Sequence, residues 1–396
     1  MTLLQVLSTT VAVAGLAVVV AIAVLFRQRN VYQWLGSYLT RRRPDAGTGV
    51  VHVMFSFVDH FEPQWGRPSY EVEVSRVARW REGYKALASR HRDADGVHPQ
   101  HTFFYPEEEY RAEHLDQIAA LCREGFGEIE VHLHHDRDTE AGLREKINRF
   151  VKVLHERHGA LPIDPATQRP AFGFIHGNWS LDNSRSDGRW CGVNNELRVL
   201  GDLGCYADFT LPSAPSDTQT RKINSIYYAT DDCDSPKSHD DGIDVRAGVR
   251  GSGDLLIVQG PLAMNWRSRR WGLVPRIENA DVRSAFPPTN ERVDLWVKQH
   301  IHVKGRPDWI FIKVHTHGTQ ERDMDALLGR PVDEMFDYLE SKYNDGKIFA
   351  LHYVNSREMF NIIKAAEDGR SGNPNSYRNF HLPRPPMFTS HVGQAT

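Results

Sequence analysis

The sequence predicts an α/β fold, a distorted (β/α) barrel that follows one N-terminal transmembrane helix. Three observations lead to this prediction. The chain opens with an uncharged apolar stretch, strand-like and helix-like segments alternate from residue 50 onward, and polar residues cluster after several of the expected strands. Alternating strands and helices favour a parallel sheet, and in a parallel barrel the carboxyl ends of the strands form one mouth where functional residues collect.

Residues 1–26 carry no charged side chain. At about 1.5 Å per residue, residues 3–26 are long enough to cross the ~30 Å hydrocarbon core of a bilayer. They lack the basic start and the small-residue cleavage site of a signal peptide, so we expect an uncleaved single-pass membrane anchor. Residues 27–49 form the expected juxtamembrane linker. Positively charged residues beside a membrane span tend to stay on the cytoplasmic side. Here they follow the span, which favours a cytoplasmic catalytic domain over a periplasmic or extracellular one: Arg27, Arg29, Arg41, Arg42 and Arg43.

The folded domain is expected over residues 50–370, with an insertion at about 212–288 and a C-terminal surface tail at 371–396. Apolar runs predict strands at 50–58, 100–105, 128–136, 171–176, 205–211, 226–230, 255–259, 308–314 and 347–354. Apolar stripes at helical spacing predict helices at 70–90, 113–123, 139–159, 194–203, 290–302, 332–342 and 355–368. Ser69 and Thr139 are placed to cap two of these helices.

The composition is that of an ordinary globular protein. Hydrophobic residues make up 40% of the 396 residues, charged residues 25%, and the formal net charge is -3. The chain lacks the basic excess of a nucleic-acid-binding protein, so nucleic acid is not an expected partner. It has 20 histidines and only 4 cysteines, none of them in a Cys-x-x-Cys pair. We therefore expect any metal site to consist of histidines and carboxylates.

The most informative stretch is Glu128-Ile-Glu-Val-His-Leu-His-His-Asp136. Side chains alternate between the two faces of a strand, so His132 and His134 point the same way. Two imidazoles side by side suit one divalent metal, most commonly zinc, and a catalytic zinc takes a third protein ligand and leaves one position for water. The alternative is a half-exposed edge strand whose polar face meets solvent.

Asp59 is the first candidate for the third ligand. It lies on the Phe55 and Phe57 face of the first strand, where a buried carboxylate needs a cation or a hydrogen-bond donor. An aspartate in a strand-end turn is the alternative. Glu62, three residues further on, is the candidate general base, because a carboxylate beside a metal can deprotonate water.

Other strand ends supply further candidates. His135 and Asp136 are alternatives for a ligand and its orienting partner, and both are also candidate substrate contacts. His176, Asn178 and Trp179 follow the fourth strand and are candidate substrate contacts, although a lone histidine there is as readily a hydrogen-bonded structural residue.

A second pair of histidines, His315 and His317, follows the late strand at 308–314 with the same spacing of two. Either imidazole can donate a proton to a leaving amine, and the alternative is that the pair binds a second metal.

The order of these motifs resembles that of the NodB-type polysaccharide deacetylases, the fourth carbohydrate esterase family, over roughly residues 50–320. Ser56-Phe-Val-Asp59 stands where that family has Thr-Phe-Asp-Asp, and Thr102-Phe-Phe104 where it has Thr-Phe-Phe. Residues 127–135 stand at its metal-binding histidine motif, and residues 309–315 resemble its late strand ending in a catalytic histidine. The resemblance implies a barrel of that type and a metal held by one aspartate and two histidines, whose water attacks an acetamide or ester carbonyl on a sugar.

Three features depart from the family pattern. The segment His176-Gly-Asn-Trp179 lacks the arginine that the family has at its fourth-strand motif. Val58 stands where the family has its general base, which leaves that role to Glu62, His60 or Asp136. The family separates its two metal histidines by three residues, so His135 competes with His134 as the second ligand. The string Asp59-His-Phe-Glu-Pro63 also resembles the opening motif of barrel glycosidases related to family fifty-seven.

We therefore expect a membrane-anchored, zinc-dependent hydrolase that removes an acyl group from an amino sugar of a cell-envelope polysaccharide or a lipid-linked glycan. The expected partners are that glycan, the membrane and polysaccharide-assembly proteins. A first alternative is a glycoside hydrolase or transglycosylase that uses Glu62 with Asp136 or Asp232. A second alternative is a non-catalytic glycan-binding component of an assembly complex.

Overall fold

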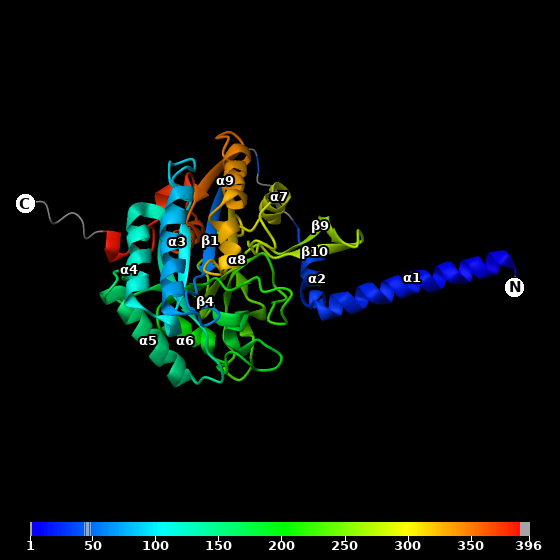
Figure 1. Ribbon diagram of the computed structural model, residues 1–396, viewed down its shortest axis with the longest axis horizontal. Coiled ribbons are helices and arrows are strands. Elements are labelled where there is room, and N and C mark those ends of the chain that lie inside the picture. The colour runs from blue at the N-terminus through cyan, green and yellow to red at the C-terminus, as the bar shows by residue number, and fades with distance from the viewer. Residues whose placement is uncertain (1, 43, 45–46, 48, 389–396) are drawn as a thin grey trace, which may run out of the picture.

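The computed structural model describes residues 2–42, 44, 47 and 49–388 (Figure 1). Its centre is a ten-stranded sheet in the order β11-β1-β2-β3-β4-β5-β8-β6-β7, and β12 also pairs with β1. Pairing is parallel from β11 through β1 to β5 and β8, and antiparallel between β8, β6 and β7. The protein is thus α/β with a mostly parallel sheet, as the alternation of strands and helices predicts.

The strands are β1 Val51–His60, β2 His101–Pro106, β3 Gly127–Leu133, β4 Phe172–His176, β5 Cys205–Asp208, β6 Ile226–Ala229, β7 Ile243–Asp244, β8 Leu255–Val258, β9 Ala263–Arg270, β10 Val274–Glu278, β11 Trp309–Thr316 and β12 Phe349–Tyr353. The α-helices are α1 Leu3–Gln28, α2 Val31–Thr40, α3 Tyr70–Ala88, α4 Ala112–Leu121, α5 Glu140–Glu156, α6 Glu196–Asp202, α7 Asn290–Gln299, α8 Glu321–Leu327, α9 Arg330–Tyr343 and α10 Ser356–Glu367. Thr139 caps α5 by accepting a hydrogen bond from the Gly142 N–H, whereas the Ser69 side chain makes no cap hydrogen bond.

Alternate positions on each strand face two different cores. On β1, Phe55 and Phe57 belong to a core that includes Trp80 of α3 and side chains from every helix between α3 and α9. Met54 and Val58 belong to a second core that includes residues of α10. Most helices therefore cover one face of the sheet, as Figure 1 shows for α3, α4 and α5, and α10 packs on the other. This alternation decides where each polar residue at a strand end points.

The expected insertion at 212–288 is partly built into the main sheet. Its strands β6 and β8 pair with each other, and β8 pairs with β5. Strands β9 and β10 form a separate antiparallel hairpin that projects from the globular part on the side of α1 and α2 (Figure 1). The segment thus extends the sheet beyond β5 instead of only covering it.

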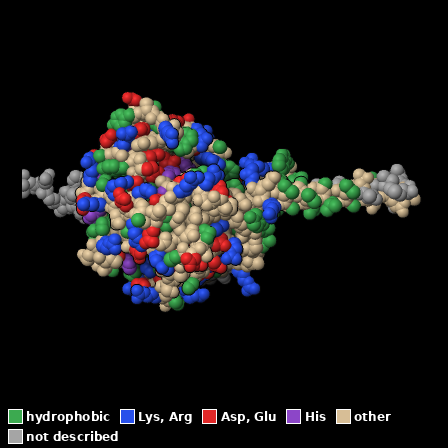
Figure 2. All heavy atoms as spheres, turned by 90° about the horizontal axis from the view of Figure 1, so that it is seen from below, with side chains coloured by type: hydrophobic (Ala, Val, Ile, Leu, Met, Phe, Trp, Pro, Cys, Tyr) green, Lys and Arg blue, Asp and Glu red, His purple; other side chains and the backbone are tan. Residues whose placement is uncertain are grey.

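The N-terminal helices differ in their contacts. Helix α1 projects away from the globular part, and Figure 2 shows hydrophobic side chains along it and Lys and Arg side chains near its base. Helix α2 packs on the domain, where Val31 and Trp34 are buried against Leu262 and Met264. Much of the expected linker at 27–49 is therefore a docked helix; residues 43, 45–46 and 48 lie outside the described part of the chain.

Within the described part of the chain, no single helix has both the length and the apolar composition that crossing a membrane requires. Two consecutive helical segments, Gly15–Gln28 and Val31–Thr40, reach that length and composition only together, and the chain bends by 101° between them.

The C-terminal segment up to residue 388 is packed on the domain, which corrects the expected surface tail at 371–396. Leu382 and Met387 are buried. The backbone oxygens of Arg378 and Leu382 accept hydrogen bonds from Arg357 and Asn361 of α10. These hydrogen bonds to the backbone hold the C-terminal segment on the domain, although its composition alone indicates a loop. Residues 389–396 of the expected tail lie outside the described residues.

Candidate functional site

Three buried residues, His60, Glu62 and His132, form a group at the carboxyl ends of β1 and β3, called the strand-end group below. Their candidate ligand atoms all lie within 4.8 Å of one another. The His132 Nε2 is 3.3 Å from Glu62 Oε1, while its Nδ1 is 2.7 Å from the backbone oxygen of Ile175. In the neutral ring, Nδ1 therefore donates to that oxygen and the lone pair on Nε2 faces the carboxylate. This is the tautomer that metal binding requires.

His134 borders the strand-end group from the rim. Its Nε2 lies 3.5 Å from Glu62 Oε1, and its Nδ1 lies 2.5 Å from Glu108 Oε1. Burial favours the neutral ring, but the hydrogen bond to Glu108 and the charge of Glu62 outweigh burial and raise the pKa of His134. Both histidines of the β3 motif thus direct Nε2 toward the same carboxylate, as strand alternation predicts.

His317 and Trp179 cover the strand-end group. The His317 ring stacks on His60 with ring centroids 4.6 Å apart, and Trp179 lies 5.5 Å from both rings. His317 and Trp179 are each partly exposed, so they lie between the buried group and solvent. His315 is buried deeper on the same face of β11, and its Nδ1 has no hydrogen-bond partner.

The structure does not bring Asp59 into this group. Asp59 and Phe57 share the face of β1 that meets the helices, whereas His60 points to the opposite face. The Asp59 carboxylate is 2.9 Å from His101 Nε2 and accepts a 2.6 Å hydrogen bond from the Gly318 N–H. Burial of this carboxylate is thus compensated by two protein partners, and Glu62 occupies the place expected for Asp59.

Burial sets the charge state of the strand-end group. It lowers the pKa of His60 well below its usual value, with His317 adding to the effect, and it lowers the pKa of His132 to about 3. Burial also raises the pKa of Glu62. Neutral imidazoles are the form that binds metal, and a divalent cation would compensate the cost of a buried carboxylate. The donor set therefore fits a zinc-type ion.

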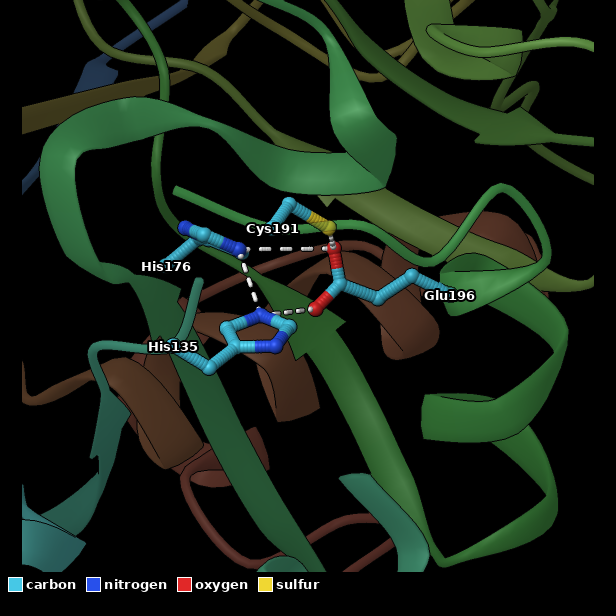
Figure 3. A group of neighbouring side chains, drawn as sticks. All are labelled: His135, His176, Cys191 and Glu196. Carbon is cyan, nitrogen blue, oxygen red and sulfur yellow. Dashed lines mark hydrogen bonds and ion pairs between the residues drawn. The ribbon is translucent and has the colours of Figure 1, made fainter. Parts of the chain in front are cut away.

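A second cluster, called the four-residue group below, contains His135, His176, Cys191 and Glu196 (Figure 3). All four residues are buried. His135 follows β3, His176 ends β4, and Glu196 begins α6. The sequence-based expectation that any metal site uses only histidines and carboxylates is therefore incomplete, because Cys191 lies among candidate ligands.

Asp136 and Asn178 take no part in either group. Asp136 is exposed and accepts a 2.6 Å hydrogen bond from the Trp190 N–H, and the Asn178 backbone oxygen accepts a hydrogen bond from Ser180. The structure therefore places His135 and His176, expected as possible substrate contacts, in the buried four-residue group, and it leaves Trp179 beside the strand-end group.

A third cluster of possible ligands consists of Asp93, Asp95 and His352. Arg378 makes an ion pair with Asp93 at 3.1 Å, and Asp95 pairs with His352 at 2.6 Å. The charges of the two aspartates are compensated by Arg378 and His352, and the pair with Arg378 holds the C-terminal segment. These contacts give the cluster a structural role.

Three residues of these groups were not predicted in these roles, His60 as a ligand, Cys191 and Glu196, and neither was Glu108, which contacts His134. His60 is visible from strand alternation, because it shares the face of β1 opposite Asp59. The other three lie outside the strands, and no spacing in the sequence relates them to the histidines.

Comparison with known proteins adds no relative. No protein-family model matches the chain, and no curated protein matches its sequence.

Proposed function

We propose that this protein is a metal-dependent hydrolase that removes an acyl group, most simply acetyl, from an amino sugar of a cell-envelope or lipid-linked glycan. The main support for this proposal is the strand-end group, in which three possible ligands converge: His60, Glu62 and His132. The partly exposed side chains of His317 and Trp179 cover this group. Concave sites with convergent polar groups at the carboxyl ends of parallel strands are the usual location for such chemistry.

His60, Glu62 and His132 would hold the metal. A divalent ion of the zinc type supplies Lewis-acid polarisation of a carbonyl and makes water more acidic. The protein keeps both imidazoles neutral by burial and fixes the His132 ring through the Ile175 backbone oxygen. The assignment of Glu62 as a ligand replaces its expected role as the general base.

Proton transfer falls to the two partly exposed histidines. His317 accepts the proton of the attacking water, since its ring stacks on His60 at the open side of the group. The Glu108 carboxylate at Nδ1 favours the protonated form of His134, so its Nε2 is placed to donate a proton. Water adds to the amide carbonyl as one of its protons passes to His317, the C–N bond breaks, and the amine leaves with the proton from His134. The acetic acid that forms gives its proton to solvent and is released as acetate.

The proposed substrate class rests on Trp179. Flat aromatic faces pack against sugar rings, and this side chain lies over His60 and His317 without a hydrogen-bond partner for its Nε1. A glycan bound there places an N-acetyl group beside the strand-end group.

The fold that we propose for this site is a distorted (β/α) barrel. Lys313 of β11, at one edge of the sheet, donates hydrogen bonds to the backbone oxygens of Phe209 and Leu211, which follow β5. These bonds join the edge strand β11 to the segment after the inner strand β5, and they support curvature of the sheet toward a barrel.

The proposed activity is tested by acetate release from N-acetylated oligosaccharides, measured together with metal content. His134→Gln is expected to retain the metal and to lose about 10²- to 10⁴-fold in kcat, the usual contribution of a proton-transfer group. The matched control is His381→Gln, because His381 is an exposed histidine of the C-terminal segment. Equal kcat values in the two variants would remove His134 from the mechanism.

A second candidate function is glycoside hydrolysis by two carboxyl groups. Asp136 is engaged with Trp190, but burial raises the pKa of Glu109 to about 8, and Glu62 adds to that shift. A protonated Glu109 near Glu62 resembles the acid of a glycosidase pair. Release of reducing ends that persists in the presence of a chelator supports this candidate, whereas glycan binding without release of either product supports a binding protein.

We also propose that α1 anchors the protein in a membrane, with the domain on the cytoplasmic side. Support comes from its apolar sequence and from the arginines that follow it, Arg27 and Arg29. Protease added to intact spheroplasts is expected to leave the domain uncut and to digest it after lysis. Digestion of the domain in intact spheroplasts contradicts the proposed side.

A further inference from the structure

The four-residue group has the composition and burial of a closed metal site. Its members come from four places in the chain: the segment after β3, the end of β4, the segment around residue 191, and the first turn of α6. The side chains of His135, His176 and Glu196 have no exposed surface, and Cys191 is fully buried. Figure 3 shows all four pointing toward one another.

The spacing of the ligand atoms is close to that around a tetrahedral ion. The two Nε2 atoms lie 2.8 Å apart, and Glu196 Oε1 lies 3.1 Å from His135 Nε2. Glu196 Oε2 lies 3.5 Å from both His176 Nε2 and Cys191 Sγ. Zinc bonds of about 2.0–2.3 Å separate tetrahedral ligand atoms by roughly 3.3–3.8 Å, so small outward movements of the two rings would admit the ion.

The remaining ring nitrogens are already occupied, which fixes both imidazoles for binding through Nε2. His135 Nδ1 lies 3.1 Å from Asp138 Oδ2, and Asp138 also pairs with Lys146. His176 Nδ1 contacts the backbone oxygen of Gly177. Both Nε2 lone pairs therefore face each other and the carboxylate, an arrangement that repels unless a cation or a proton lies between them.

Cys191 is a buried thiol, and burial raises its pKa with the charge of Glu196 adding to the effect, so loss of its proton requires a cation beside the sulfur. Its sulfur accepts hydrogen bonds from the Asn183 N–H at 3.3 Å and the Val193 N–H at 3.4 Å. Two backbone donors stabilise negative charge on sulfur, and a sulfur ligand excludes calcium and magnesium in favour of zinc. Glu196 is fixed in turn by the Asp182 N–H at 2.6 Å.

We propose that His135, His176, Cys191 and Glu196 bind a zinc ion at a second, structural site. Four protein ligands complete a tetrahedral shell, so this site has no open position for a substrate. The thiol of Cys191 loses its proton to solvent when the ion binds. The proposal does not depend on the hydrolase activity proposed above.

The proposed role of this zinc is to hold the segment at residues 177–195 against the sheet. That segment contains only short 3-10 turns, and Asn178, Trp179 and Asp182 adopt left-handed backbone conformations. It also carries Trp179, which covers the strand-end group. The zinc would thus position the aromatic side chain of the site without touching the substrate.

Cobalt substitution of the full-length protein tests the proposal without a mutation. A cysteine-bound tetrahedral Co²⁺ gives a sulfur-to-metal charge-transfer band in the near ultraviolet and strong visible absorption. We expect both in the wild-type protein loaded with Co²⁺. Absence of the charge-transfer band at full cobalt loading overturns the proposal and indicates that the group holds a shared proton instead.

Variants separate this site from the strand-end group. Cys191→Ser is expected to lose the charge-transfer band and close to one equivalent of zinc, whereas His132→Ala should keep the band. The matched control is Cys122→Ala, because Cys122 is also buried but follows α4 and belongs to none of the three clusters of possible ligands. If Cys191→Ser does not fold, Glu196→Gln tests the same loss of zinc. Unchanged zinc content in a folded variant contradicts the assignment, whether or not the protein is a hydrolase.

Discussion

At the scale of single residues, strand alternation decides which polar groups meet. It explains why His132 and His134 both face Glu62, which the sequence predicts for the two histidines. It also explains why Asp59 does not join them, since Asp59 lies on the opposite face of β1 from His60. The sequence indicates that a buried Asp59 needs a partner, but it does not show that the partner is His101.

Asp59→Asn tests this placement. The amide replaces a carboxylate that contacts His101 and accepts a hydrogen bond from the Gly318 N–H. We expect the free energy of unfolding to fall by roughly 1–3 kcal/mol, while the metal content stays unchanged. The measurement is urea unfolding with metal analysis, and Asp325→Asn, on a largely exposed carboxylate, is the control. Loss of metal with unchanged stability would instead restore Asp59 as a ligand.

The four-residue group shows the limit of reasoning from residue patterns. His135 and His176 are recognisable as strand-end histidines. Cys191 and Glu196 lie beyond β4 in an irregular segment, and their positions depend on backbone turns that have no repeating sequence signal. A lone cysteine without a Cys-x-x-Cys partner gives no indication of metal binding until the fold brings histidines beside it.

At the scale of elements, apolar periodicity is sufficient to locate most of the sheet and its helices. The observed bounds of β1, α3, α5 and α10 lie within a few residues of the predicted ones. Helix α2 and the β9–β10 hairpin were not predicted, because their apolar residues face other parts of the chain or solvent and not the main core. Tertiary contacts decide the structure of such segments.

A buried ion pair joins α10 to the sheet. The Nε and Nη2 atoms of Arg357 donate hydrogen bonds of 2.9 and 2.7 Å to the carboxylate of Glu128 on β3. Arg357→Ala leaves this carboxylate buried without a cation, so we expect a loss of about 3–5 kcal/mol in the free energy of unfolding. Denaturant unfolding measures it against Arg330→Ala, which breaks an exposed pair. Similar losses in the two variants would contradict the structural role of Arg357.

His91 connects the end of α3 to α9 and makes stability depend on pH. Burial disfavours its charged form, but the carboxylates of Glu340 and Asp333 outweigh burial and raise the pKa of His91. A raised folded-state pKa gives stability that is fully present below the unfolded value of about 6.5 and is lost as pH rises through the folded value. We expect His91→Gln to weaken this loss of stability, measured by urea unfolding as pH rises from about 6.5. An identical pH profile in the variant would contradict the assignment.

At the scale of the whole molecule, a mostly parallel sheet collects histidines from distant parts of the chain at its carboxyl edge. The strand-end group joins β1 and β3, and His317 follows β11, which lies beside β1 in the sheet. The four-residue group anchors the adjacent segment that carries Trp179. The α/β class was predictable from the sequence, whereas the division of the histidines into two groups depended on which face each strand end presents.

The most direct test of the proposed chemistry is metal content measured together with acetate release for the wild-type protein and His132→Ala. We predict that the wild-type protein releases acetate from an N-acetylated glycan and that a chelator stops this release. We predict that His132→Ala loses close to one equivalent of metal and its acetate release together. Metal content unchanged in His132→Ala, with acetate release that a chelator does not affect, would contradict a catalytic metal at the strand-end group.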